Sequence, residues 1–268
     1  IRGDEWLSSL PKHLYLYQVF GWTAPQFAHL PLLLNADKSK LSKRQGDVAV
    51  EDYLNKGYLP EALVNFVALL GWNPTADREV FTKEELATLF DVTKVNKAGA
   101  VFNIEKLDWL NGEYIKALPL DEYLQRLSRG GFLPEGVMQE RAARIVKDRL
   151  ARLEQAPALI AEAVSVADYE VPSLVWKKST PDEAKTRLDG VTEYVSSKPE
   201  SWFGDVKTME EETRAWIIEK GWGNGDTLWP LRIALSGREK SPSPFELMFI
   251  AGKDEALARI ATAVAKMA

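Results

Sequence analysis

Four cationic side chains stand within seven positions of the sequence, at Lys38, Lys40, Lys43 and Arg44. They follow residues 27–34, a compact apolar run that predicts a buried strand. Loops at the carboxyl ends of α/β strands usually bind ligands, and cationic groups there can hold phosphate oxygens and offset charge developing on a triphosphate. Composition alone favours a solvated charged turn. A phosphate site is the alternative interpretation, and the order Lys-Leu-Ser-Lys-Arg within the loop is the feature that bears on the choice.

A second concentration of positive charge lies in residues 139–153, which have helical periodicity. One face carries Ala142, Ala143, Val146, Leu150 and Leu153, and the other carries Arg141, Arg144, Lys147 and Arg152, with Arg149 near the boundary. A basic helix face is most often simply solvated. It also suits the phosphates of a nucleic acid, so both interpretations stay open.

The elements that must position these groups are mostly helices. Short helices are predicted over residues 11–20 and 60–70, each followed by a glycine. A capping-box match at Thr82 and a cap at Asn103 start two more. Further helices are predicted over residues 120–129, 136–153, 181–196, 208–220, 227–236 and 245–266. The predicted fold class is mainly α, with an incomplete α/β start in residues 1–46.

Length and composition exclude several classes of protein. The chain has 268 residues, which favours roughly two domains. It has no cysteine and only two histidines, His13 and His29, which excludes disulfides and makes a protein-bound zinc very unfavourable. The net charge of −5 is against the simplest expectation for a nucleic-acid binder but says little about local patches. No apolar stretch can span a bilayer, so we expect a reduced, cytoplasmic protein with no membrane partner.

The loop sequence resembles the KMSKS loop of class I aminoacyl-tRNA synthetases, in the Lys-Leu-Ser-Lys-Arg form typical of glutamyl-tRNA synthetases. The resemblance extends to residues 1–9, 27–32, 57–63, 68–72, 101–107 and 229–237. The family's nucleotide-binding half, with its HIGH signature, does not appear in this sequence. The resemblance therefore implies the C-terminal portion of a bacterial-type glutamyl-tRNA synthetase.

The resemblance also implies site residues at matching positions. It makes Lys43 the residue that contacts ATP and stabilises the transition state of adenylate formation. Arg2 then holds the glutamate substrate, and Glu5 and the backbone of Leu33 meet the ATP. Catalysis of this kind is electrostatic positioning with no covalent enzyme intermediate. ATP enters as a substrate with Mg²⁺, and the KMSKS-like loop consists of Lys40, Leu41, Ser42, Lys43 and Arg44.

In the helical region, the resemblance implies that Arg149 reads the third anticodon base of the glutamate tRNA, since an arginine can both bond to and stack on an exposed base. Arg144 and Lys147 would hold tRNA phosphates. The implied domains are residues 1–46, the end of a Rossmann-type catalytic domain; 47–115, a stem-contact linking domain; and 116–268, an all-helical anticodon-binding region with subdomains near 116–200 and 201–268. A monomer is expected.

The implied activity is ATP-dependent attachment of glutamate to its tRNA through a glutamyl-adenylate, with this chain alone expected to be inactive. The alternative is a stand-alone helical RNA-binding or protein-docking module without catalysis, which would have no need of the ATP loop. A shorter paralogue that glutamylates a modified base lacks the long helical region, and the glutaminyl relative has β-barrels there. Whether the glutamine tRNA is also charged stays open.

Overall fold

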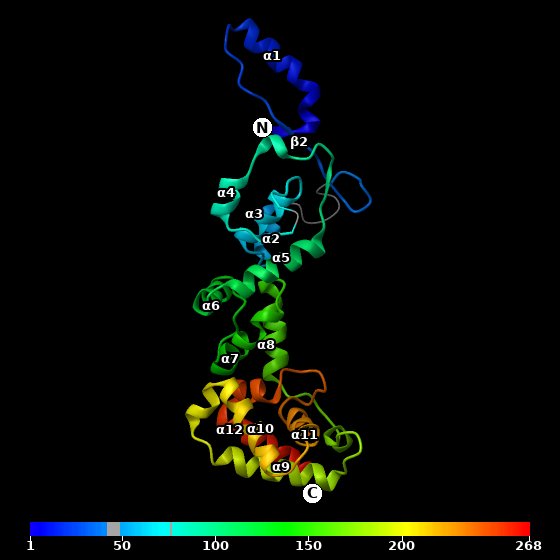
Figure 1. Ribbon diagram of the computed structural model, residues 1–268, viewed down its shortest axis with the longest axis vertical. Coiled ribbons are helices and arrows are strands. Elements are labelled where there is room, and N and C mark those ends of the chain that lie inside the picture. The colour runs from blue at the N-terminus through cyan, green and yellow to red at the C-terminus, as the bar shows by residue number, and fades with distance from the viewer. Residues whose placement is uncertain (42–48, 76) are drawn as a thin grey trace. The chain divides into compact units, whose positions relative to one another are not determined.

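The computed structural model describes residues 1–41, 49–75 and 77–268. The chain divides into two compact units. Unit 1 comprises Ile1–Leu118 together with Arg149–Glu154, and unit 2 comprises Pro119–Asp148 and Gln155–Ala268. Helices dominate both units (Figure 1). The mainly α fold class predicted from the sequence is confirmed.

Unit 1 combines short parallel strand pairs with helices. The strand β1 (Arg2–Gly3) pairs with β2 (His29–Leu30), and β3 (Leu33–Leu34) pairs with β4 (Ala100–Val101). The helices and 3-10 turns are η1 (Asp4–Ser9), α1 (Leu10–Val19), α2 (Val50–Asn55), α3 (Pro60–Leu69), α4 (Lys83–Leu89), η3 (Val92–Lys94) and α5 (Ile104–Ala117).

The single buried strand predicted over residues 27–34 is wrong in two respects. The segment forms two separate strands, β2 and β3, with Pro31 between them, and a proline has no N–H to offer a sheet. The segment is also less buried than predicted, because Phe27 is exposed and the rest is only partly buried. Of the two strands, β3 leads directly into the cationic turn.

The core of unit 1 lies between α3 and α5. Phe66 of α3 packs with Leu107 and Leu110 of α5, all nearly inaccessible to solvent. The cap predicted at the start of α5 is present, since the Asn103 side chain accepts a hydrogen bond from the Lys106 N–H at 3.0 Å. A cap of this kind contributes about 1 kcal/mol. It helps to fix helix α5, which carries Asp108 and Asn111.

The regular secondary structure of unit 2 consists of helices and 3-10 turns in its described residues. The segment from α7 to α8 passes through unit 1 at residues 149–154. The elements are α6 (Leu120–Arg129), α7 (Val137–Val146), η4 (Lys147–Arg149), η5 (Leu153–Gln155), α8 (Ala156–Val164), η6 (Val171–Leu174), α9 (Pro181–Ser196), η7 (Glu200–Gly204), α10 (Val206–Glu219), α11 (Asn224–Ser236) and α12 (Pro244–Lys266).

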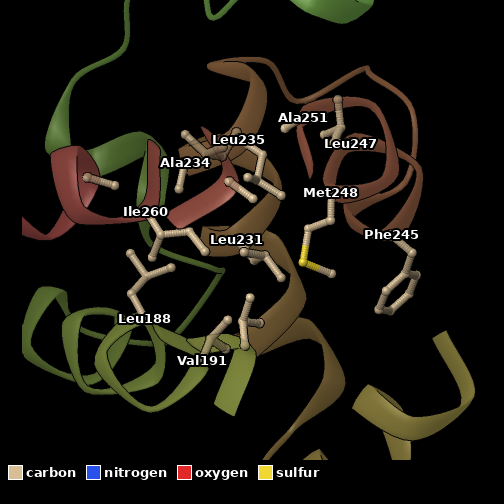
Figure 2. Packing of buried hydrophobic residues seen from close by; sticks show 14 of the residues in the cluster. Leu188, Val191, Leu231, Ala234, Leu235, Phe245, Leu247, Met248, Ala251 and Ile260 are labelled. Carbon is tan, nitrogen blue, oxygen red and sulfur yellow. The ribbon is translucent and has the colours of Figure 1, made fainter. Parts of the chain in front are cut away.

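The core of unit 2 forms where α9, α11 and α12 meet. Figure 2 shows Leu188 and Val191 of α9 directed toward Leu231 of α11 and Ile260 of α12. Each of these four side chains is fully buried. Helix α12 is kinked at Gly252, whose φ of 74° no other residue type adopts easily. The kink lets both halves of α12 contribute side chains to this core.

The helix predicted over residues 136–153 ends early. Helix α7 stops at Val146, the 3-10 turn η4 follows, and residues 150–152 are not helical. The reason is tertiary: Leu150 is buried, and the carbonyl of Ala151 accepts a hydrogen bond from Asn111 of α5. The predicted position of Arg149 at the edge of one helix face is therefore wrong, and helix α8 was not predicted.

Candidate functional site

The described part of the cationic loop is a tight, internally bonded turn. The Asn35 N–H donates to the Ser39 carbonyl at 2.8 Å, and the Asp37 carboxylate accepts from both the N–H and the hydroxyl of Ser39, at 2.8 and 2.6 Å. These two bonds lower the pKa of Asp37, the hydroxyl contributing most. Lys38 takes a left-handed conformation with φ of 66°. The turn thus has a fixed shape set by short-range bonds.

This turn returns the chain to the strand that precedes it. Lys40 bridges back to Leu34, and the Leu41 N–H donates to the Leu33 carbonyl at 3.0 Å. The structure therefore brings together Leu33, Lys40 and Leu41, three of the predicted site residues. Lys40 is exposed at the end of β3. The predicted site residues Ser42, Lys43 and Arg44 lie outside the described residues.

Arg2 and Glu5 belong to a different strand pair. Arg2 pairs with His29 in β1 and β2, and its guanidinium lies over the Trp6 ring, 4.7 Å from the centroid. The Glu5 carboxylate folds back over Gly3, so a Cβ at that glycine would lie 2.2 Å from a Glu5 oxygen. Both Arg2 and Glu5 are exposed. The strand pair β1–β2 positions these two residues, whereas the cationic turn follows β3.

Arg149 is the first residue of the segment 149–154, which packs as part of unit 1. Its side chain is exposed, and three residues later Arg152 donates to both carboxylate oxygens of Asp108, at 2.9 and 2.8 Å. Arg152 also donates to Glu154 at 2.9 Å. Burial opposes the charge of Arg152, but these carboxylate bonds outweigh it and raise the pKa of the guanidinium. The predicted placement of Arg152 on a basic helix face is wrong, because residue 152 is not helical and its side chain bonds to Asp108 of α5.

Asp108, Tyr58 and Asn111 were missed by reasoning from sequence. The Tyr58 hydroxyl donates to the Asp108 carboxylate, and burial together with this bond raises the pKa of Tyr58. Asn111 is fully buried and accepts from the Leu59 N–H at 2.8 Å while donating to Ala151. No local pattern marks these residues, since their partners lie about 40 to 50 positions away.

The two other predicted tRNA-binding residues lie in unit 2. Arg144 forms an ion pair with Glu140 one turn earlier in α7, at 2.8 Å. The Lys147 ammonium lies 5.9 Å from the centre of the Tyr123 ring. Burial raises the pKa of Tyr123, whose hydroxyl donates to the Ala143 carbonyl at 3.0 Å. Both cations are thus partly engaged within unit 2.

In residues 1–41, 49–75 and 77–268, no helix is long and apolar enough to cross a membrane. Over the same ranges, no group of three or more His, Asp or Glu side chains is placed to hold a metal ion.

The chain matches two family models in succession. Residues 1–109 match the catalytic domain of class I tRNA synthetases of the E and Q type, and residues 103–264 match an anticodon binding domain. The chain belongs to the class I tRNA synthetases of the E and Q type. The match to the synthetase catalytic domain includes the cationic turn. The match to the anticodon binding domain includes Arg144, Lys147 and Arg149.

Individual synthetases of this family are similar over nearly the whole chain. The glutamate–tRNA ligase of Prosthecochloris aestuarii is 42% identical over 274 residues, 97% of this chain and 54% of the ligase. That of Clostridium acetobutylicum is 36% identical over 100% of this chain and 56% of the ligase. The crystal structure of a glutamate tRNA ligase from Elizabethkingia meningosepticum, in complex with its amino acid, superposes with a TM-score of 0.78 at 30% identity, covering 100% of this chain and 57% of that one. The chain therefore spans a little over half the length of these relatives.

Proposed function

We propose that this chain is part of a glutamate–tRNA ligase, which activates glutamate with ATP as glutamyl-adenylate and transfers it to the 3′ end of the glutamate tRNA. The observation that carries the proposal is the succession of a catalytic-domain match and an anticodon-binding match on one chain. Relatives that share 36 to 42% of its residues carry the name of this ligase. The chain would supply the KMSKS-like loop and the recognition of the anticodon.

In this proposal the cationic loop stabilises negative charge on the triphosphate. Lys43 is the catalytic residue, contacting the phosphates as pyrophosphate departs, and preorganised cations lower a barrier of this kind without any covalent intermediate. The short-range bonds of the turn before it support such a role, because they fix where the loop leaves β3. Leu33 meets the ATP through its backbone, and Glu5 is also assigned to the ATP.

Arg2 is assigned to the carboxylate of the glutamate substrate. A guanidinium donates two parallel hydrogen bonds in the geometry that a carboxylate accepts. Its exposure is compatible with this role. Magnesium is assigned to the ATP itself, and the described residues offer no carboxylate cluster that would hold the ion without the nucleotide.

Recognition of the tRNA is assigned by the type of contact. Arg149 reads the third anticodon base, because base contacts specify sequence, and Arg144 and Lys147 contact phosphates, which position without specifying. Residues 1–46 would complete the catalytic domain, 47–115 would contact the stem, and 116–268 would form the anticodon-binding region. We place the enzyme in the cytoplasm, as a monomer.

The alternative, a helical RNA-binding or protein-docking module without catalysis, is not favoured, because residues 1–109 match a catalytic domain. The decisive measurements are binding and pyrophosphate exchange. The 268-residue chain should bind the glutamate tRNA selectively, yet exchange pyrophosphate only at background, because it spans a little over half of its relatives' length. Equal affinity for unrelated tRNAs would contradict anticodon recognition, and clear exchange would contradict the expected inactivity of the chain alone.

A further inference from the structure

Residues 149–154 pack as part of unit 1, although the chain on either side of them belongs to unit 2. The backbone of this segment is held at two positions. The Ala151 carbonyl accepts a hydrogen bond from the Asn111 side chain at 2.5 Å, and the Leu153 N–H donates to the Gly57 carbonyl at 3.2 Å. The Leu150 side chain is buried at 2% exposure. The segment is therefore anchored along most of its length.

The ion pair between Arg152 and Asp108 adds a charged anchor to these contacts. One guanidinium nitrogen donates to both oxygens of Asp108, and the Nε donates to Glu154. The two side chains of the pair are 25% and 27% exposed, so salt screens the pair less than it screens a surface pair. A planar guanidinium bonded at two edges has one favoured orientation. The Tyr58 hydroxyl completes the arrangement by donating to Asp108.

Arg149 lies three residues before this anchor, at the end of the 3-10 turn η4. A three-residue tether spans at most about 10 Å, so the anchor limits where the backbone of Arg149 can stand. Arg149 itself is exposed. Hydrogen bonds to a base edge tolerate only a few tenths of an ångström and a narrow range of angles. An arginine side chain on a loosely held backbone would therefore bond to several bases equally well.

We infer that the ion pair between Arg152 and Asp108 is a positioning device for specificity, which fixes Arg149 where it discriminates one unstacked RNA base from another. The inference rests on the proposed role of Arg149. Arg152 is a positioning residue here and does not itself touch the RNA. Its loss should lower the discrimination between bases more than the total affinity, since phosphate contacts supply most of the affinity.

The test uses the 268-residue chain and two transcripts of the glutamate tRNA, one with the natural anticodon and one altered only at the third anticodon base. Affinities for both are measured for wild type and for Arg149→Ala, Arg152→Ala, Arg152→Lys and Asp108→Asn. The matched control is Arg126→Lys, because Arg126 is 24% exposed and its Nε and Nη2 both donate to Glu122. Unfolding midpoints are recorded for every variant.

Arg149→Ala should lower the discrimination ratio about ten- to a hundredfold, and Arg152→Ala should lower it about tenfold, as for groups that orient a ligand. The double variant Arg149→Ala/Arg152→Ala should lose no more discrimination than Arg149→Ala alone. Arg152→Lys keeps the charge and should restore most of the unfolding midpoint, but not the ratio, because an ammonium lacks the planar fork. Arg126→Lys should leave the ratio unchanged.

Two results separate failure of the inference from failure of the proposed function. If Arg149→Ala lowers the ratio but Arg152→Ala weakens both transcripts equally, Arg152 only stabilises the fold and the inference is overturned alone. A ratio that recovers in Arg152→Lys in step with the unfolding midpoint overturns it in the same way. If Arg149→Ala leaves the ratio untouched, Arg149 is not the reader, and the inference is overturned together with that part of the proposed function.

Discussion

Gly57 approaches Leu153 so closely that a Cβ added to the glycine would lie 2.6 Å from the Cβ of Leu153. The glycine also has φ of 77°, a left-handed conformation that L side chains rarely adopt. This contact brings the turn between α2 and α3 against residues 149–154. The closeness of the two backbones excludes any side chain at position 57 without a shift of one of them.

Gly57→Ala should therefore destabilise unit 1 by about 2–4 kcal/mol, the sum of left-handed strain and overpacking. The measurement is urea unfolding, with hydrogen exchange to locate the loss. Gly21→Ala is the matched control, since Gly21 has φ of 66° and no atom within 4 Å of an added Cβ. It should lose only about 1 kcal/mol. Equal losses in the two variants would show that the contact with Leu153 is unimportant.

Arg259 joins the ends of two helices in unit 2. It is 8% exposed and donates to carbonyls in the last turns of α11 and α8, those of Leu235 at 2.8 Å and Val164 at 2.7 Å. Arg259→Ala should cost about 2–4 kcal/mol, because it leaves buried carbonyls without donors. Arg214→Ala, which breaks an ion pair with Glu210 in which both side chains are 43% exposed, should cost at most about 1 kcal/mol. Comparable losses in urea unfolding would contradict the buried role of Arg259.

Tyr114 gives unit 1 a dependence on alkaline pH. Burial raises the pKa of Tyr114 to about 12, against about 10 in an unfolded chain. The neutral phenol is thus favoured in the folded state, so its contribution is fully present below pH 10 and is lost as the pH rises toward 12. After allowance for partial exposure, the loss should be about 1 kcal/mol.

The measurement is the free energy of unfolding between pH 9 and 12, which covers the range from the unfolded to the folded pKa of Tyr114. Tyr114→Phe should flatten this part of the curve, although it also loses hydrogen bonds to Phe81 and Asn65. For that reason the variants are compared by the slope of the unfolding free energy against pH, and not by the absolute free energy of unfolding. Tyr15→Phe serves as the control at an exposed position. An unchanged slope in Tyr114→Phe would assign the pH dependence to other groups.

The features predicted correctly from sequence depend on neighbouring residues. The caps at Thr82 and Asn103 form as predicted, and the helices predicted over 120–129 and 181–196 match α6 and α9. A cap or an apolar period is set within a few positions, so one sequence is enough to find it.

The features missed depend on distant residues. Arg152 has the spacing of a solvated helix face, but its partner Asp108 lies 44 positions earlier. The helical run ends before residue 150 because Leu150 is buried and the Ala151 carbonyl bonds to Asn111. Tertiary contacts override local helix propensity in such cases. The cationic loop differs again, because its interpretation rested on the order of five residues, and the roles assigned to them stay predictions.

Lys43→Ala should lower the rate of adenylate formation about a hundred- to a thousandfold in a ligase of the relatives' full length that carries this sequence, as for loss of one preorganised charge donor. Affinity for tRNA should change little, because Lys43 is assigned to the triphosphate. The measurement is single-turnover adenylation with tRNA present. Lys38→Gly is the control: it removes a nearby cation and suits the left-handed conformation at that position. Equal rates for Lys43→Ala and wild type would show that this loop is not the ATP loop.

Salt dependence should distinguish the phosphate contacts from base reading. Each lost phosphate contact lowers the slope of log affinity against log salt by about one, so Lys147→Ala should flatten the slope and weaken the natural and altered transcripts alike. Arg144→Ala should have a smaller effect, because the ion pair with Glu140 already partly neutralises the charge of Arg144. By the same argument, Glu140→Gln should release Arg144 and strengthen binding of both transcripts at low salt. Titrations of these variants at several salt concentrations check all three expectations. Weaker binding by Glu140→Gln would mean that the ion pair holds Arg144 in its RNA-binding orientation. A change in the discrimination ratio by Lys147→Ala would assign base reading to Lys147, at the start of η4, in place of Arg149.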